Sequence, residues 1–408
     1  MTKFIKNTFI IFFILIIFTS KGFSQKSIII FKTDYSNNYM NYAIYDLIIK
    51  NIFLYSNLKI INSYSNYSSY NKIKSQIKKL TINNNANISI AYQIQNFKNG
   101  ILINYIIFDN EKPNEWIEKS AYSKEEDLFI SINKILKDIY EISKIKNKIT
   151  YIKEKDYISL LGYYSQKIIL TNNEDNIYKL FYDFHKDNIY FNIDYLEYLT
   201  DKSDRTSVDI IDDLIKNMQN YINKKKNHYY LYSLGCMHYG KYKVNVILSD
   251  IEASIENYNK ALKLKNNYYK YYYRLANAYI LKNDYDNAIK YYEEAIKLNE
   301  YDINIIKEFV SLLKRDINKN GNEVISYLKK IIEINKNDEE ALEEISKLYE
   351  KIGDYDNALI YYNKLFEVIN YNLYIINNET KDADAYDRYI FKRNSIKLNI
   401  ESLKKKIF

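Results

Sequence analysis

Residues 269–302 read YKYYYRLANAYILKNDYDNAIKYYEEAIKLNEYD, and this stretch decides the fold of the carboxy-terminal half. Large and small apolar residues recur at helical spacing before and after Lys282-Asn283-Asp284. They are Tyr272, Leu275, Ala276 and Tyr279 on one side, and Ala288, Tyr292 and Ala295 on the other. The pattern predicts two packed amphipathic helices, in which the alanines let the backbones approach and the tyrosines fill the adjoining grooves.

The same pattern recurs along the chain. The second-helix position recurs at Ala261, Ala295, Ile331 and Leu365, in steps of 34, 36 and 34 residues. The small first-helix position recurs at Gly235, Ala276, Val310 and Ser346, and the longer first step fits an insertion around 242–249. Residues 283–288 (NDYDNA) and 353–358 (GDYDNA) repeat the turn. Four repeats are therefore predicted, at 228–268, 269–302, 303–338 and 339–372.

These residues resemble the tetratricopeptide (TPR) repeat, although Val310, Ile331 and Leu365 are larger than usual and the prolines between repeats are missing. The resemblance implies a superhelix in which positions five and nine of each first helix line a concave groove. Those positions hold Tyr232, Cys236, Tyr273, Asn277, Lys307, Ser311, Glu343 and Lys347. The lining changes from aromatic and neutral to charged, which favours an extended peptide as the ligand.

Helices are also expected on both sides of the repeats. Residues 149–227 are predicted to be helical, for example at 157–171 and 208–223, and degenerate repeats are one interpretation. Residues 373–408 are predicted to form a capping helix on the open end of the array. Its apolar stripe is Tyr389, Ile396, Ile400, Leu403 and Ile407. A helix lying on a membrane surface is the alternative, because Lys404–Lys406 follow the stripe.

Residues 1–24 have the layout of a secretory signal peptide. Lys3 and Lys6 precede an apolar run at 9–18, and Gly22 and Ser24 are small residues before an expected cleavage at Gln25. The run is about half of the roughly 20 apolar residues that span a bilayer, so an uncleaved anchor is the less favoured alternative. We expect a periplasmic or extracellular protein with no transmembrane span after cleavage.

Residues 25–148 have a different pattern, with short β-type runs alternating with helical ones. The expected order is a strand at 28–31, a helix at 39–55, a strand at 58–61, a helix at 70–80, three strands at 88–97, 101–108 and 116–122, and a final helix. Asn99-Gly100 is expected to turn the hairpin, and Ser123 with Glu126 to cap the last helix. The order resembles periplasmic α/β domains of the TolB and curli-secretion type, which implies a role in envelope assembly.

Residues suited to catalysis are few. The chain has three histidines and one cysteine, and Cys236 and His238, two positions apart on a predicted helix, point to different faces. The net charge of +8 falls to +5 without Lys3, Lys6 and Lys21, and acids interleave with bases, which does not favour nucleic acid. We therefore expect no metal, no cofactor and no enzymatic activity.

The predicted fold class is α+β, with a small amino-terminal α/β domain followed by an all-α TPR superhelix. The predicted function is an exported scaffold or adaptor that binds an unknown protein or peptide in the bacterial envelope. The alternative is an accessory factor for envelope secretion or assembly that acts through residues 25–148.

Overall fold

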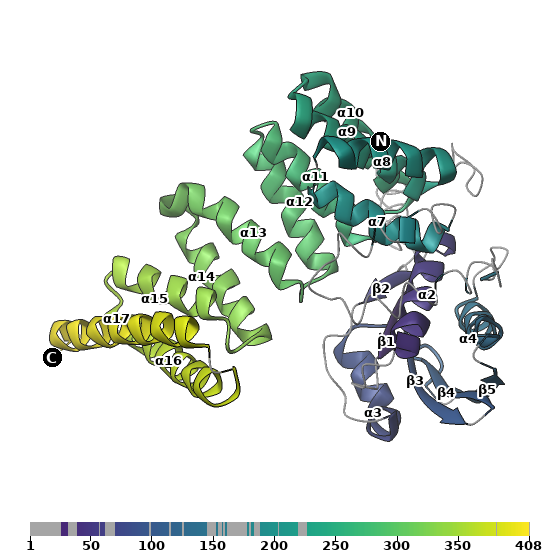
Figure 1. Ribbon diagram of the computed structural model, residues 1–408, viewed down its shortest axis with the longest axis horizontal. Coiled ribbons are helices and arrows are strands. Elements are labelled where there is room, and N and C mark those ends of the chain that lie inside the picture. The colour runs from purple at the N-terminus through teal and green to yellow at the C-terminus, as the bar shows by residue number, and fades with distance from the viewer. Residues whose placement is uncertain are drawn as a thin grey trace, which may run out of the picture. The chain divides into compact units, whose positions relative to one another are not determined.

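The structure is a computed structural model, and it forms two compact units, Met1–Tyr271 and Tyr272–Phe408. Figure 1 labels their helices and strands. The residues described are 26–31, 39–56, 58–61, 70–97, 99–113, 116–124, 126–144, 152–153, 157, 160, 178, 181–182, 188–202, 204–218, 227–380 and 382–407. The helix expected at 157–171 lies almost wholly outside these ranges.

The first unit begins with an α/β domain whose elements follow the predicted order. The elements are β1 (Ser27–Phe31), α2 (Tyr39–Tyr55), β2 (Lys59–Ile61), α3 (Tyr70–Asn83), β3 (Ile88–Phe97), β4 (Gly100–Asp109), β5 (Trp116–Ser123) and α4 (Leu128–Ile142). The α+β character of the chain is thus confirmed, since a small sheet precedes a helical carboxy-terminal part. The helices that follow in this unit are α7 (Ile189–Lys202), α8 (Arg205–Met218), α9 (His228–Asn245) and α10 (Leu248–Leu264).

The five strands form one sheet in the order β2-β1-β3-β4-β5. The strand β1 pairs in parallel with β2 and β3, whereas β3, β4 and β5 form an antiparallel meander. Phe97 pairs with Gly100, so Gly100 is the first residue of β4 and is not part of the turn that was expected at Asn99-Gly100. Glycine is required at position 100, because a Cβ there would lie 2.6 Å from the carbonyl oxygen of Ser123.

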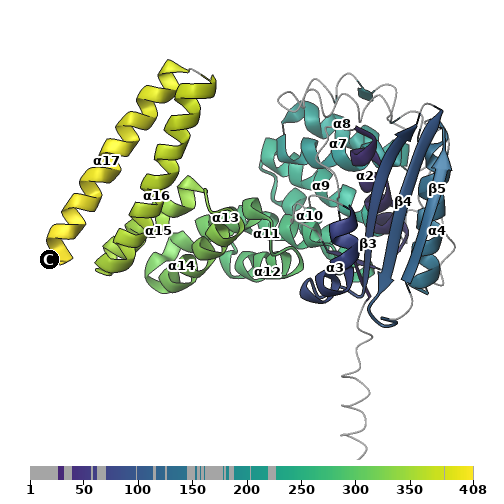
Figure 2. The same ribbon diagram turned by 90° about the horizontal axis from the view of Figure 1, so that it is seen from below.

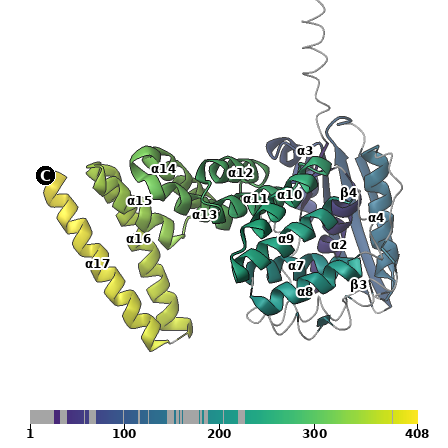
Figure 3. The ribbon, with the colours of Figure 1, turned by 90° about the horizontal axis from the view of Figure 1, so that it is seen from above.

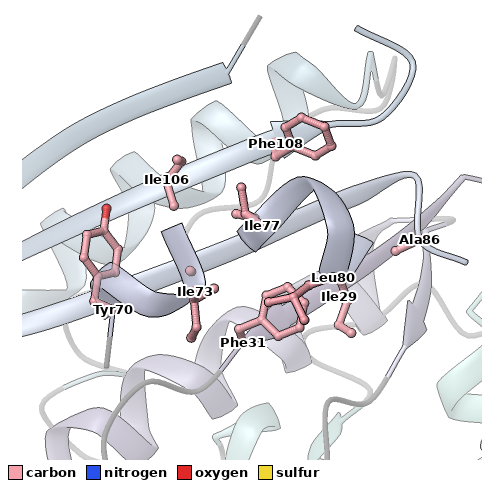
Figure 4. Packing of buried hydrophobic residues seen from close by; sticks show 10 residues of the cluster. Ile29, Phe31, Tyr70, Ile73, Ile77, Leu80, Ala86, Ile106 and Phe108 are labelled. Carbon is pink, nitrogen blue, oxygen red and sulfur yellow. The ribbon is translucent and has the colours of Figure 1, made fainter. Parts of the chain in front are cut away.

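Helices cover both faces of the sheet, as Figure 2 shows for α4 along β4 and β5. Alternate residues of each strand point to opposite faces, so each strand contributes to two cores. On one side, α3 packs against β1, β3 and β4 (Figure 4), and the cluster there consists of Ile29, Phe31, Tyr70, Ile73, Ile77, Leu80, Ala86, Ala91, Ile106 and Phe108. On the other side, the Tyr105 hydroxyl donates to Asp138 of α4 at 2.6 Å.

The predicted helix cap at Ser123 is wrong. Ser123 is the last residue of β5 and pairs with Ile101 of β4, so its backbone is committed to the sheet. The helix α4 begins later, at Leu128, and its capping residue Asp127 makes no side-chain cap. The Ser123 hydroxyl instead accepts a hydrogen bond from Ser131 at 2.9 Å, which ties the strand to the helix.

Polar and aromatic contacts join α2 to later helices of the first unit. Lys50 of α2 forms ion pairs with Asp46 at 2.6 Å and with Asp194 of α7 at 2.9 Å. At the end of α2, the ring of Phe53 lies 5.2 Å from that of His228 and 4.2 Å from that of Tyr268. The α/β domain is therefore packed against α7 and the residues that flank α9 and α10.

The second unit is a series of helices, each packed against the next. The helix α11 (Tyr269–Leu281) enters it at Tyr272, and the others are α12 (Tyr285–Leu298), α13 (Ile303–Leu313), α14 (Ile317–Ile334), α15 (Glu339–Lys351), α16 (Tyr355–Ile375) and α17 (Ala383–Ile407). Direct packing joins α12 to α13 and so on through α17. No helix within the described ranges is both long and apolar enough to cross a membrane.

Both recurring positions of the sequence pattern lie in the core. Ala261, Ala295, Ile331 and Leu365 are all fully buried, and Gly235, Ala276, Val310 and Ser346 are buried as well. The larger residues at three of these sites are therefore accommodated by the packing around them. The insertion expected at 242–249 extends α9 to Asn245 and places Val246 in a left-handed conformation.

The repeated turn has the same geometry at both places. Asn283 and Gly353 end their helices with positive φ angles of 61° and 81°, a conformation that asparagine and glycine tolerate. The next residue caps the following helix, since Asp284 accepts from the backbone N–H of Asn287 and Asp354 from that of Asn357. The motif is thus a helix stop followed at once by a helix start.

The final helix α17 packs along α16, as Figure 3 shows. Three residues of the expected stripe, Ile396, Ile400 and Leu403, are buried. Tyr389 of the same stripe donates its hydroxyl to Glu339 of α15 at 2.8 Å. The stripe therefore serves packing against the preceding helices.

Candidate functional site

The expected groove residues fall in both units, and the two in the first unit are buried. Tyr232 of α9 is fully buried, and its hydroxyl donates to Glu197 of α7 at 2.6 Å. Cys236, one turn later, is also fully buried, with its sulfur 3.5 Å from the hydroxyl of Tyr258. Both residues are packing elements in this structure, and neither presents a surface to a ligand.

Tyr273 and Asn277 of α11 belong to a hydrogen-bonded cluster with two residues that the sequence pattern did not single out as site residues. The Tyr273 hydroxyl donates to Glu308 Oε1 at 2.9 Å. The Tyr292 hydroxyl lies within hydrogen-bond distance of both Asn277 Oδ1 and Glu308 Oε2. Burial raises the pKa of Tyr273 above its usual value, so the ring stays neutral and donates to the carboxylate. Replacing Tyr273 or Asn277 would therefore change the stability of the fold as well as the lining of the concave groove expected from the repeats.

The charged positions form ion pairs, some between helices and one within a helix. Lys307 of α13 lies 3.0 Å from Asp338 and 2.7 Å from Glu340. Burial alone would lower the pKa of Lys307, but its hydrogen bonds to the two carboxylates raise it above the usual value. On α15, Lys347 pairs with Glu343 at 2.5 Å, and Lys392 of α17 approaches Glu343 at 3.6 Å. Ser311 is exposed.

Two adjoining cavities lie beside these residues in the second unit. The smaller has a volume of about 100 Å³ and is lined by Lys307, Val310, Ser311, Lys314, Leu328, Ile331, Glu340, Ala341 and Glu344. The larger has a volume of about 470 Å³ and is lined by Lys314, Ile317, Val324, Leu328, Glu344, Lys347, Leu348 and Lys351. We call the two cavities together the α13–α15 groove. It gathers Lys307, Ser311 and Lys347 of the predicted residues.

The chemistry of the α13–α15 groove is that of a binding surface. Val324, Leu328 and Ile331 of α14 contribute apolar side chains to its lining, and Lys314 and Glu344, which form an ion pair 2.6 Å long, line both cavities. A lining of apolar residues with a few charged groups suits the side chains of a bound segment. Lys314, Glu344 and Lys351 were not predicted as site residues. Lys314 follows Lys307 by seven residues, and Lys351 follows Glu344 by seven residues, a spacing of about two helical turns.

The imidazoles occupy structural positions where they are described. His228 is packed against Phe53, and its Nδ1 lies 2.6 Å from the Tyr271 hydroxyl. Burial lowers the pKa of His228 to about 3, so the ring is neutral at physiological pH. His238 lies 3.0 Å from Asp250, and His185 falls outside the described residues. The described ranges contain no cluster of three or more potential metal-binding His, Cys, Asp or Glu side chains.

The antiparallel helix pairs with a shared period define a helical-repeat protein. More specifically, the tetratricopeptide repeat family models match residues 269–302 and 339–372. The chain therefore contains two tetratricopeptide repeats, at the two places where the NDYDNA and GDYDNA turns occur. The other two expected segments, 228–268 and 303–338, each fold as a helix pair, α9–α10 and α13–α14, and their assignment as repeats stays a prediction.

Solved structures of MamA are similar to part of the chain. One is 23% identical and covers 39% of this chain and 88% of its own, with a TM-score of 0.31. A second is 23% identical and covers 47% and 95%, with a TM-score of 0.33, and a third is 17% identical and covers 43% and 98%, with a TM-score of 0.30. No curated protein matches the chain.

Proposed function

We propose that this protein is an exported, non-enzymatic scaffold whose α13–α15 groove binds an extended segment of a protein partner in the bacterial envelope. Tetratricopeptide repeats imply protein partners, and the groove adjoins the repeat at 339–372. The observation that carries the proposal is the pair of adjoining cavities, which share Lys314, Leu328 and Glu344 in their linings. The apolar residues of the lining suit an apolar side chain, and the charged residues suit the polar groups around it.

The charges of the groove favour a peptide over a nucleic acid. Lys307 and Lys314 are each neutralised by a carboxylate of α15 or its cap, through Glu340, Asp338 and Glu344. A surface that follows phosphates needs unneutralised basic groups along one face. Charges that are already paired can still form hydrogen bonds with a peptide backbone. Binding of the peptide then leaves no buried ion unpaired.

Export and the envelope setting rest on the amino-terminal sequence. Lys3 and Lys6, the apolar run at 9–18 and the small residues before Gln25 support cleavage by a signal peptidase. The resemblance of residues 25–148 to periplasmic α/β domains of the TolB and curli-secretion type supports a place in envelope assembly. We expect amino-terminal sequencing of the protein from its native cells to begin at Gln25. A chain that retains Met1 in the cytoplasm would contradict export.

A site-specific photo-crosslinker tests the groove in native cells. Placed at Ser311 or Lys351, which line the two cavities, it should crosslink a protein partner in the envelope fraction. The matched control is Lys297, an exposed lysine on α12 that lines neither cavity. Equal crosslinking of the same partner from Lys297 would show that the groove is not the binding site.

A further inference from the structure

The last helix, α17, presents an apolar stripe on the side opposite its packed face. Phe391 is 78% exposed, which is the highest value among the large apolar side chains described, and Leu398 is 65% exposed. The buried residues Ile396, Ile400 and Leu403 lie on the other side of the same helix, which packs against α16. A helix with apolar side chains on both faces has one face left to cover.

The exposed face carries a regular charge pattern around its apolar centre. Asp384, Phe391, Leu398 and Lys405 follow one another at intervals of seven residues, so they form one nearly straight stripe along about 31 Å of helix. Two further charged residues lie beside that stripe, Arg388 about one turn before Phe391 and Glu401 about one turn after Leu398. All six side chains are exposed.

These charges form no ion pairs with the residues that the structure describes. Within the described part of the chain, neither Asp384, Arg388, Glu401 nor Lys405 forms an ion pair. By contrast, the lysines on the packed side of α17 are paired, Lys392 with Glu339 and Lys406 with Glu350. The outer face is therefore apolar at its centre and carries one acidic and one basic residue toward each end, Asp384 and Arg388 at the first and Glu401 and Lys405 at the second.

We propose that this face binds a second copy of the chain, with the two α17 helices antiparallel. A two-fold axis between Asn394 and Ser395 places Phe391 against Leu398 of the second copy. The same register places Asp384 against Lys405 and brings Arg388 level with Glu401 across the seam between the helices, and each pair occurs twice. An interface of this kind is isologous, and heptad spacing suits helices that cross at about 20°. This inference does not depend on the function proposed for the α13–α15 groove.

A second copy fits this face better than a membrane surface does. Asp384, Asp387 and Glu401 share the exposed side with Phe391 and Leu398, and anionic headgroups would repel them. In the antiparallel pair, Asp384 and Glu401 face basic residues instead. The contact between two helix faces is small for a protein interface, on the order of 1,000 Å², so the dimer is reversible and depends on concentration.

Sedimentation velocity of the full chain tests the proposal, over protein concentrations from about 1 to about 200 µM. The wild type should pass from monomer to dimer in this range. Arg388→Glu and Glu401→Arg should each weaken the dimer about tenfold or more, because each places like charges opposite one another twice. The double variant R388E/E401R reverses both partners and should restore the wild-type dimer. Lys336→Glu, an exposed lysine between α14 and α15, makes the same kind of charge reversal away from the face and should leave the dimer unaltered.

Several results would overturn the proposal. A wild type that stays monomeric at every concentration would overturn it. Binding of that monomer to anionic vesicles through Phe391 would assign the face to a membrane surface instead. A dimer that neither charge reversal weakens, or one that the double variant fails to restore, would exclude this register. Phe391→Ser gives a second route that leaves the charges in place, and a dimer of unchanged stability in that variant would exclude this face.

Discussion

At the residue scale, one glycine shows how closely the repeat helices approach. A Cβ at Gly235 of α9 would lie 2.5 Å from Cε1 of Tyr258 in α10, a ring that is itself fully buried. We expect Gly235→Ala to lower the free energy of unfolding by about 1–3 kcal/mol, since the ring has no free space to move into. Urea unfolding measures the change.

The control for this prediction is Gly321→Ala in α14. A Cβ at Gly321 meets nothing within 4 Å. Alanine there should leave the free energy of unfolding unchanged or raise it by about 0.5–1 kcal/mol, because alanine favours a helix. Equal effects of the two substitutions would contradict the close approach at Gly235.

Lys265 gives the fold a dependence on pH. Its Nζ donates to the carbonyl oxygens of Phe53 at 2.5 Å and Ser56 at 2.9 Å, at the end of α2. Burial lowers the pKa of Lys265 from 10.5 to about 7. Between these two values the unfolded chain binds the proton and the folded chain does not, so the free energy of unfolding rises with pH.

The rise should approach about 1.4 kcal/mol per pH unit above pH 7, and Lys265→Met should remove it. The test compares urea unfolding of the wild type and the variant at pH 7, 8 and 9, where the difference isolates this side chain from other titrating groups. Parallel curves for the two proteins would show that the lysine does not titrate in this window.

At the element scale, the repeated turn explains why two repeats are recognisable from the sequence alone. Asp354 caps α16 by accepting from Asn357, and the Asn357 side chain donates back to Asp354 at 2.8 Å. We expect Asp354→Ala to lower the free energy of unfolding by about 1 kcal/mol, because the first turn of α16 loses its cap. Circular dichroism during thermal unfolding measures the effect.

Asp356, two residues later, is the matched control for the cap. Its side chain is exposed in the same first turn and is not the capping residue. Asp356→Ala removes the same charge near the helix start and should cost only a few tenths of a kcal/mol. A loss as large as that of D354A would assign the effect to charge and not to the cap.

The elements were predictable wherever a local pattern determines them. Alternation of apolar and polar residues predicted the strands, and helical spacing predicted α11, α12, α15 and α16 together with the buried positions Ala276 and Ala295. The start of α4 was not predictable in this way. The backbone of Ser123 pairs with Ile101, a residue far away in the sequence, and that pairing overrides its capping preference.

At the scale of the whole molecule, the sequence predicted part of the candidate site. Tyr232 has the position of a groove residue, but Glu197 of α7 accepts its hydroxyl hydrogen bond, and no repeat pattern reveals that helix. The shape of the α13–α15 groove depends on how far α13 and α15 lie apart over α14. That spacing depends on packing, so Lys314, Leu348 and Lys351 became visible as lining residues only in the structure.

The central claim is that the α13–α15 groove binds the protein partner, and a groove-filling substitution tests it most directly. Ser311 is exposed and lines the smaller cavity, so Ser311→Trp should fill that cavity without disturbing the core. The affinity of the purified full chain for its crosslinked partner should fall at least tenfold, by about 1.4 kcal/mol or more. Lys336→Trp adds a tryptophan at an exposed position outside the groove and should bind like the wild type. Wild-type affinity in a folded S311W protein would contradict the claim.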